Sequence, residues 1–152
     1  MSGSNHLTES SRLCLSLMRV GTRMASGFDT RFALHGITQA QFRVLLGVWQ
    51  IGGRDGSVTP SVLADALFIE RPTVTALVAK LVERDLLVRV PDAADRRSHG
   101  LRLTAAGGEL LQTTGAVATR LGADTLAPFS DADKAIFASL LTRLESHLRG
   151  GI

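Results

Sequence analysis

Apolar residues recur at helical spacing in six stretches of this chain. In residues 8–33 they repeat every three or four positions and so mark one face of a long helix, at Leu13, Leu17, Val20, Met24 and Phe28. Further stripes predict helices that begin near Thr38, Thr59, Glu70, Thr104 and Ser130. Two short segments, residues 86–90 and 101–104, predict the arms of a β-hairpin. The pattern predicts a mainly α-helical chain with one small hairpin.

Some helix ends can be located from particular residues. Thr38 and Gln41 have the spacing of a capping box at the start of the second helix. Pro60 directly after Thr59 suits the first position of the third helix. The second helix is expected to stop at Gly52 and to bury the side chains of Phe42, Leu45, Leu46 and Trp49.

The fourth helix and the segment after it have the layout of a DNA-reading element. Residues 72–84 form an amphipathic pattern whose first turn carries the hydroxyls of Thr73 and Thr75. An arginine-tipped loop follows between the two predicted strands. A groove-sized helix followed by a basic hairpin is typical of a winged helix-turn-helix. The expected fold class is therefore mainly α with a small β-hairpin wing: a winged helix-turn-helix DNA-binding lobe plus a helical dimerisation region.

The charge distribution agrees with this interpretation. The chain has 152 residues and a net charge of +3, and 45% of its residues are hydrophobic, which suits one folded domain. Between Arg71 and Arg102, seven basic residues accompany four acidic ones, while the remaining residues balance. The excess positive charge therefore lies in the predicted recognition helix and wing, where it would attract polyphosphate.

Several local motifs occur in an order that resembles the MarR family of bacterial transcription regulators. They are Gly36 to Phe42, Leu63 to Leu67, Pro72 to Leu81, and Asp95-x-Arg97 followed by Leu101 to Gly107. The likeness covers about residues 10 to 148. Two positions where the family often has glycine hold Phe68 and Asp85, and aspartate tolerates left-handed backbone better than most residues.

The resemblance implies a domain organisation and partners. Residues 1–152 would form a single domain, with a winged helix-turn-helix lobe at 37–104 and dimerisation helices at 8–36 and 105–149. The expected partners are a second copy of the chain, a near-palindromic double-stranded DNA operator and a small effector, aromatic or anionic. The two recognition helices of a dimer would lie about 34–36 Å apart. The expected function is that of a repressor released by this effector.

The recognition helix and the helix before it supply the first group of candidate DNA contacts. Burying the apolar face of residues 72–84 turns Thr73, Ala76 and Lys80 outward, with Thr75 on the flank. Hydroxyls and a methyl group there suit phosphates, base edges and thymine methyls. Phosphate contacts are expected from residues at helix ends, namely Arg71, Arg84, Thr59 and Ser61.

The wing supplies the second group. Arg97 is the sharpest candidate, because a planar cation suits the negative potential of a narrow minor groove. Asp95 is expected to orient that guanidinium, and Arg96 and Arg102 are expected to contact phosphates. The alternative for Arg97 is an ordinary surface ion pair.

An effector pocket and a redox residue are weaker candidates. Such a pocket would be lined by Phe28, Phe32, Phe42 and Trp49 with Arg43 as a polar partner, although aromatic stripes more often belong to a core. Cys14, in the first helix, resembles the reactive cysteine of the organic-hydroperoxide-sensing branch of the family. The chain has no tyrosine to engage a thiolate, so Cys14 behaving as a small core hydrophobe is the competing interpretation.

Other function classes find little support. No nucleophile elbow, phosphate-binding glycine loop or metal-ligand cluster occurs, so no enzyme, cofactor or metal is expected. No apolar run reaches the length of a membrane span and no signal pattern is present, so a cytoplasmic protein is expected. Two alternatives remain open: a thiol-based hydroperoxide-sensing regulator acting through Cys14, and a winged-helix protein–protein module without a nucleic-acid role.

Overall fold

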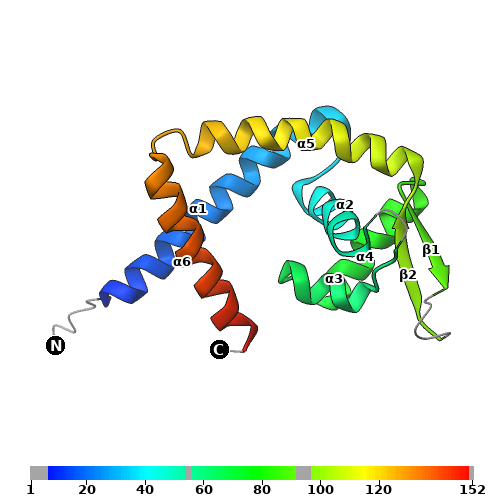
Figure 1. The fold of residues 1–152 in the computed structure, drawn as a ribbon, viewed down its shortest axis with the longest axis horizontal. Coiled ribbons are helices and arrows are strands. Elements are labelled where there is room, and N and C mark those ends of the chain that lie inside the picture. The colour runs from blue at the N-terminus through cyan, green and yellow to red at the C-terminus, as the bar shows by residue number, and fades with distance from the viewer. Residues whose placement is uncertain (1–6, 54–55, 92–96, 151–152) are drawn as a thin grey trace, which may run out of the picture. The chain divides into compact units, whose positions relative to one another are not determined.

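A computed structural model describes residues 7–53, 56–91 and 97–150. Its elements, in chain order, are α1 (Glu9–Phe32), η1 (Ala33–His35), α2 (Gln39–Gly52), α3 (Pro60–Leu67), α4 (Arg71–Glu83), β1 (Leu87–Pro91), β2 (His99–Leu103), α5 (Ala105–Thr125) and α6 (Asp131–Arg149) (Figure 1). The predicted fold class, mainly α with a small hairpin, is confirmed. The chain forms two compact units, residues 1–117 and 118–152, and α5 runs through the boundary.

The predicted helix caps are present. Thr38 Oγ1 accepts the N–H of Gln41 at 3.1 Å, and Gln41 Oε1 accepts the N–H of Thr38 at 3.0 Å. Thr59 caps α3 with Pro60 at its first position, and Ser130 caps α6. These side chains satisfy backbone donors that have no partner inside their helices. The α2 boundary at Gly52 and Gly53 is likewise as predicted.

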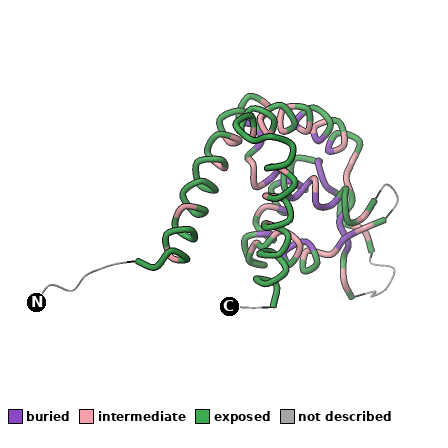
Figure 2. The backbone as a smooth tube through the Cα atoms, turned by 60° about the vertical axis from the view of Figure 1, so that its left-hand side comes forward, coloured by how far each residue is buried: buried purple, intermediate pink, exposed green. Residues whose placement is uncertain are grey.

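The core of the first unit lies where α2, α3, α4 and the hairpin pack together. Its largest fully buried side chains include Phe32, Leu45, Leu63, Leu81 and Leu101. Figure 2 shows buried positions gathered in these elements, whereas α1 is exposed along most of its length. Burial of this apolar surface holds α4 against α2 and α3.

The hairpin is antiparallel, with Leu87 opposite Leu103 and Pro91 opposite His99. Val58, in the segment before α3, forms a bridge with Leu101 through hydrogen bonds of 3.2 and 2.8 Å. The wing is therefore attached to the segment that leads into the helix-turn-helix.

Among the described residues, two that are not glycine adopt left-handed backbone at turns. Phe68, at the end of α3, has φ 52°, and Asp85, between α4 and β1, has φ 57°. These are the two positions at which members of the MarR family often have glycine. The second turn is closed by Thr104, whose hydroxyl donates to the Asp85 carbonyl oxygen at 2.6 Å and accepts the N–H of Gly107 at 3.0 Å.

One burial prediction for α2 is wrong. Trp49 was expected in the core with Phe42 and Leu45, but its side chain is 53% exposed, and Leu46 is only partly buried. The apolar stripe of α2 is wider than the part of α2 that α3 and α4 cover. Trp49 and Leu46 instead line an open pocket beside α5.

The second unit contains the end of α5 and α6. A capping box formed by Ser130 and Asp133 begins α6, and the rings of Phe129 and Phe137 pack edge to face at 5.7 Å. None of the residues of α6 is buried, and its large exposed side chains are Ile136, Leu140, Leu144 and Leu148.

Candidate nucleic-acid interface

The outward face of α4 carries the residues predicted for it. Val74, Val78 and Leu81 are fully buried, so the helix is held by that side. Thr73, Ala76 and Lys80 are exposed on the other side. The face therefore offers a hydroxyl, a methyl group and a cation to a ligand with both phosphate and apolar edges.

Thr75 is also exposed, but its hydroxyl donates to the Arg71 carbonyl oxygen at 2.9 Å. While that bond is made, Thr75 can only accept a hydrogen bond, so a phosphate oxygen would have to displace it. The hydroxyl of Thr73 is therefore more available than that of Thr75 for a hydrogen bond to a ligand.

The helix starts that were expected to meet phosphates differ from one another. At α3, Thr59 Oγ1 accepts the N–H of Val62 at 3.3 Å, and Ser61 is exposed. At α4, Glu70 occupies the N-cap position without a side-chain cap bond, and the exposed Arg71 is the first helical residue. The first turn of α4 therefore combines uncapped backbone N–H groups with an arginine, both favourable for an anion.

Arg84 has a partner that sequence reasoning missed. It lies at the C-cap of α4, and its Nη1 donates to the Gly36 carbonyl oxygen at 2.7 Å. That bond joins the recognition helix to the turn between η1 and α2. No local pattern could have indicated it, because the two residues are 48 positions apart.

Two arginines of the wing region, Arg97 and Arg102, are exposed in the described part of the chain. Arg97 is exposed just before β2 begins at His99. Arg102 is exposed opposite Val88, on the face of the hairpin away from the buried Leu101. Asp95 and Arg96 lie outside the described residues, so the predicted orientation of Arg97 by Asp95 stays a prediction. The wing and α4 lie next to each other through the packing of α4 on β1.

The five residues suggested for an effector pocket lie in different local surroundings in the described part of the chain. Phe28, Phe32 and Phe42 form a ring cluster, with centroid separations of 5.6 Å and 4.8 Å, and Phe32 and Phe42 are buried in the core. The guanidinium of Arg43 donates to the Leu67 carbonyl oxygen at 2.6 Å, near the end of α3. Trp49 lies elsewhere.

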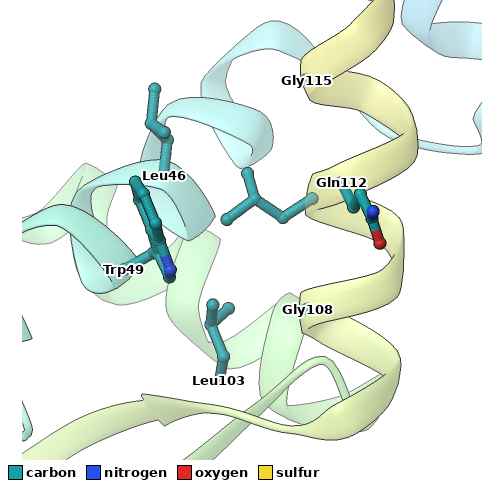
Figure 3. A pocket seen from close by; sticks show the side chains of 7 residues that line it. Leu46, Trp49, Leu103, Gly108, Gln112 and Gly115 are labelled. Carbon is teal, nitrogen blue, oxygen red and sulfur yellow. The ribbon is translucent and has the colours of Figure 1, made fainter. Parts of the chain in front are cut away.

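Trp49 lines a different pocket, of about 350 Å³. Its lining comes from α2, the end of β2 and the first half of α5: Leu46, Trp49, Leu103, Gly108, Leu111, Gln112 and Gly115. Figure 3 shows Leu46 and Trp49 across from the side of α5 that carries Gly108 and Gly115. Of the candidate pocket residues named from the sequence, Trp49 alone lines this pocket, because apolar residues that face a cavity have the same spacing as residues that face a core.

The remaining candidate for reactive or metal-binding chemistry lies outside α4 and the wing. Cys14 is an exposed free thiol on α1. Within the described ranges, no three His, Cys, Asp or Glu side chains gather where they could hold a metal ion. No helix in the described part of the chain is both long and apolar enough to cross a bilayer.

Comparisons with known proteins agree with this geometry. Residues 35–98, which contain α2 to the wing, match the model of the MarR family. The chain is 29% identical over 133 residues to the HTH-type transcriptional regulator PecS of Dickeya dadantii, a match that covers 88% of this chain and 80% of PecS.

Solved structures share the fold. The S. aureus MepR–DNA complex has a TM-score of 0.78 at 24% identity and covers 94% of this chain and 100% of the MepR chain. The organohalide sensing regulator RdhR, in its 2,4-dichlorophenol bound form, has a TM-score of 0.82 at 18% identity and covers 98% and 88% of the two chains. The architecture of these neighbours is that of this chain. Residues 35–98 therefore match the MarR family of DNA-binding transcription regulators, and the chain has the winged-helix fold of these proteins.

Proposed function

We propose that the protein acts as a homodimeric repressor that binds a near-palindromic operator and is released by a small effector. The observation that carries the proposal is the outward face of α4, with Thr73, Ala76 and Lys80 exposed above a fully buried apolar side. In this proposal α4 enters the major groove, and Arg97 reaches the adjacent minor groove. Arg71, Ser61, Thr59, Arg102 and Arg96 would hold phosphates and so fix the register without reading sequence.

The exposed apolar surface of two helices supports a dimer. Phe32 is the buried residue of α1, while large side chains along the same helix are exposed: Leu13, Leu17, Met18, Val20 and Met24. Helix α6 buries none of its residues and exposes an apolar stripe. Contiguous apolar surface of this kind marks an interface, and a second copy offers a matching one through two-fold symmetry. A dimer would bring two recognition helices to successive major grooves, about 34–36 Å apart.

Two similar proteins lend support from their own complexes. MepR was crystallised with DNA, and RdhR was crystallised with 2,4-dichlorophenol. We infer that this chain likewise responds to a small molecule, and that occupancy changes the fit of the two lobes to DNA. Repression follows if the bound dimer excludes the polymerase from the promoter.

The proposal is tested by binding of the purified protein to the DNA upstream of its own gene. Affinity should fall by about 10³–10⁵ between about 50 and 200 mM salt if roughly 6–10 phosphates are contacted. Sedimentation should show a dimer, and Leu144→Glu on α6 should yield a monomer with strongly reduced DNA affinity. Transcription in vitro from the same fragment should decrease when the protein is added.

Substitution of Arg97 gives a more specific test of the wing. Arg97→Ala should weaken binding to all sequences, and Arg97→Lys should restore only part of the affinity, because lysine keeps the charge and lacks the planar fork. Wild-type affinity in both variants would remove the wing from the proposal. Binding that ignores salt, or a monomer that binds as tightly as the wild type, would overturn the dimeric regulator itself.

A further inference from the structure

The carbonyl end of α3 is capped by a side chain from another helix. Nη2 of Arg43, on α2, donates to the carbonyl oxygen of Leu67, the last residue of α3, at 2.6 Å. That oxygen has no partner inside α3, because the next two backbone N–H groups, those of Phe68 and Ile69, both donate to the carbonyl oxygen of Ala64. A guanidinium at this point makes a charge-assisted hydrogen bond at the negative end of the helix dipole. Arg43 therefore closes α3 from α2.

The side chain of Leu67 is held against the same helix. Gly47 lies about one turn beyond Arg43 on α2, and a Cβ added there would come within 2.6 Å of Leu63 Cδ1 and 3.5 Å of Leu67 Cδ2. The glycine thus lets α3 approach α2 closely at this point. Leu67 meets α2 through both its side chain and its carbonyl oxygen, so the end of α3 cannot rotate against α2 without disturbing both contacts.

Helix α4 follows directly and is held by a similar contact at its far end. Residues 68–70 join Leu67 to the start of α4 at Arg71, so the anchored end of α3 places the first turn of α4. Beyond the last turn, Arg84 Nη1 donates to the carbonyl oxygen of Gly36, in the turn that leads toward α2, at 2.7 Å. One arginine-to-carbonyl bond therefore lies before α4 and one after it, and together they restrain the tilt of α4 against α2.

We propose that Arg43 is a positioning residue for base recognition, which acts with Arg84 to fix the tilt of α4 and does not itself contact DNA. The inference rests on the proposed function, in which α4 enters the major groove. Hydrogen bonds to base edges require donor–acceptor distances of about 2.7–3.2 Å and good alignment, so they are lost when a helix tilts. Attraction to phosphates is long-range and tolerates such a displacement. Release of the Leu67 carbonyl oxygen should therefore weaken binding to the operator more than binding to random DNA.

The test compares substitutions at Arg43 on two DNA fragments, the region upstream of the gene and a random sequence of equal length. Arg43→Met keeps an unbranched side chain and removes the donor, so operator affinity should fall by about five- to tenfold while affinity for random DNA changes by less than about twofold. The slope of log affinity against log salt should stay unchanged, because no phosphate contact is lost. Arg43→Lys retains a donor and should recover part of the preference. Fluorescence anisotropy, with the active fraction fixed by stoichiometric titration, measures each value.

Arg31→Met is the matched control, because Arg31 is an exposed arginine in the last turn of α1 and its removal changes the net charge equally. Its ratio of operator to random affinity should remain that of the wild type.

A double substitution tests whether the two arginines restrain the same motion. If Arg43 and Arg84 fix one tilt from opposite ends of α4, the loss of either bond already frees that tilt. The combined variant, Arg43→Met with Arg84→Ala, should then lose less operator preference than the product of the two single losses. A loss equal to that product would overturn the shared restraint.

Failure of this inference differs from failure of the proposed function. A wild type that does not prefer the operator over random DNA would overturn the proposed function and the positioning role with it. If the wild type has that preference and Arg43→Met retains it, only the positioning role is overturned. A salt slope reduced by about 0.9 in Arg43→Met would show a direct phosphate contact, and equal losses on both fragments would show a general effect on folding. Either result would overturn the role of Arg43 in base recognition.

Discussion

Arg84 at the end of α4 donates a hydrogen bond from Nη1 to the carbonyl oxygen of Gly36, at a distance of 2.7 Å. Gly36 lies in the turn that leads from η1 to α2, in left-handed backbone at φ 65°. The start of the same helix α2 is held from the other direction, because Asp29 on α1 accepts the N–H of Gln39 at 2.6 Å. The orientation of the recognition helix is thus coupled through two polar contacts to α1.

This contact predicts a specific result for Arg84→Ala. Operator affinity should fall by roughly five- to tenfold, comparable to the loss of about 1 kcal/mol for one net hydrogen bond. The slope of log affinity against log salt should stay unchanged, because Arg84 positions α4 without neutralising a phosphate. Fluorescence anisotropy at a series of salt concentrations measures both quantities. A slope reduced by about one would show instead that Arg84 contacts a phosphate.

Lys80 and Thr73 should separate phosphate contact from sequence reading. Lys80→Ala is expected to weaken binding to specific and random DNA alike and to reduce the salt slope by about 0.9. Thr73→Val removes a hydroxyl while keeping the shape, so it should change the preferred bases and leave the slope intact. Lys134→Ala on α6, which breaks the pair with Asp131, is the control for a lost surface charge. Selection of operators from a random library measures the preference, and an unchanged preference in Thr73→Val would remove that residue from base recognition.

Two adjacent glycines in α5 should respond in opposite directions to alanine. At Gly107 the new Cβ would overlap the Leu86 carbonyl oxygen, which is backbone and must shift, so Gly107→Ala should lower the free energy of unfolding by about 1–3 kcal/mol. At Gly108 the space is open, and Gly108→Ala should raise it by about 0.5–1 kcal/mol. Urea denaturation at matched protein concentration gives both values. Equal effects at the two sites would contradict the close approach of α5 to the turn after α4.

The start of α6 should be sensitive to acid. The hydroxyl of Ser130 donates to Asp133 Oδ2 at 2.6 Å and its backbone N–H donates to the same atom at 3.1 Å; these bonds hold the pKa of Asp133 below its ordinary value of 3.8. Because the folded state has the lower pKa, it binds fewer protons than the unfolded state near that value. The stabilisation is complete above the unfolded pKa and is lost as the pH falls through the folded one.

The measurement is an NMR titration of the Asp133 carboxyl carbon. Ser130→Ala removes the hydroxyl donor, so the pKa of Asp133 should rise toward its ordinary value, and the first turn of α6 should lose protection from hydrogen exchange. A titration of Asp133 that Ser130→Ala does not alter would contradict the capping geometry.

The elements could be predicted from the sequence because their ends carry local signals. Thr38 with Gln41, Thr59 with Pro60, and Ser130 each satisfy backbone donors within three residues, so spacing alone indicates where a helix begins. The outward face of α4 could also be predicted, since the burial of Val74, Val78 and Leu81 follows from helical periodicity.

Features that depend on distant partners could not be predicted in the same way. The bond from Arg84 to Gly36 and the bond from Arg43 to Leu67 each join residues more than twenty positions apart, and both arginines were read as contacts for a ligand or for DNA. Trp49 was assigned to the core because a hydrophobic stripe does not reveal whether the neighbouring helix fills the space. Here the space beside Trp49 forms a pocket between α2, the end of β2 and α5.

The hydroxyl of Thr104 makes two hydrogen bonds at once. It donates its proton to the carbonyl oxygen of Asp85, in the turn after α4, and it accepts the N–H of Gly107 in the first turn of α5. Rotating α5 about its axis would have to carry the Asp85 turn along or break the bonds from Thr104 to Asp85 and Leu86. The start of α5 and the turn after α4 are thus joined at Thr104 by one side-chain bond and one backbone bond. Serine would keep the hydroxyl bond to Asp85, whereas valine, nearly identical in shape, would leave only the backbone bond from residue 104 to Leu86.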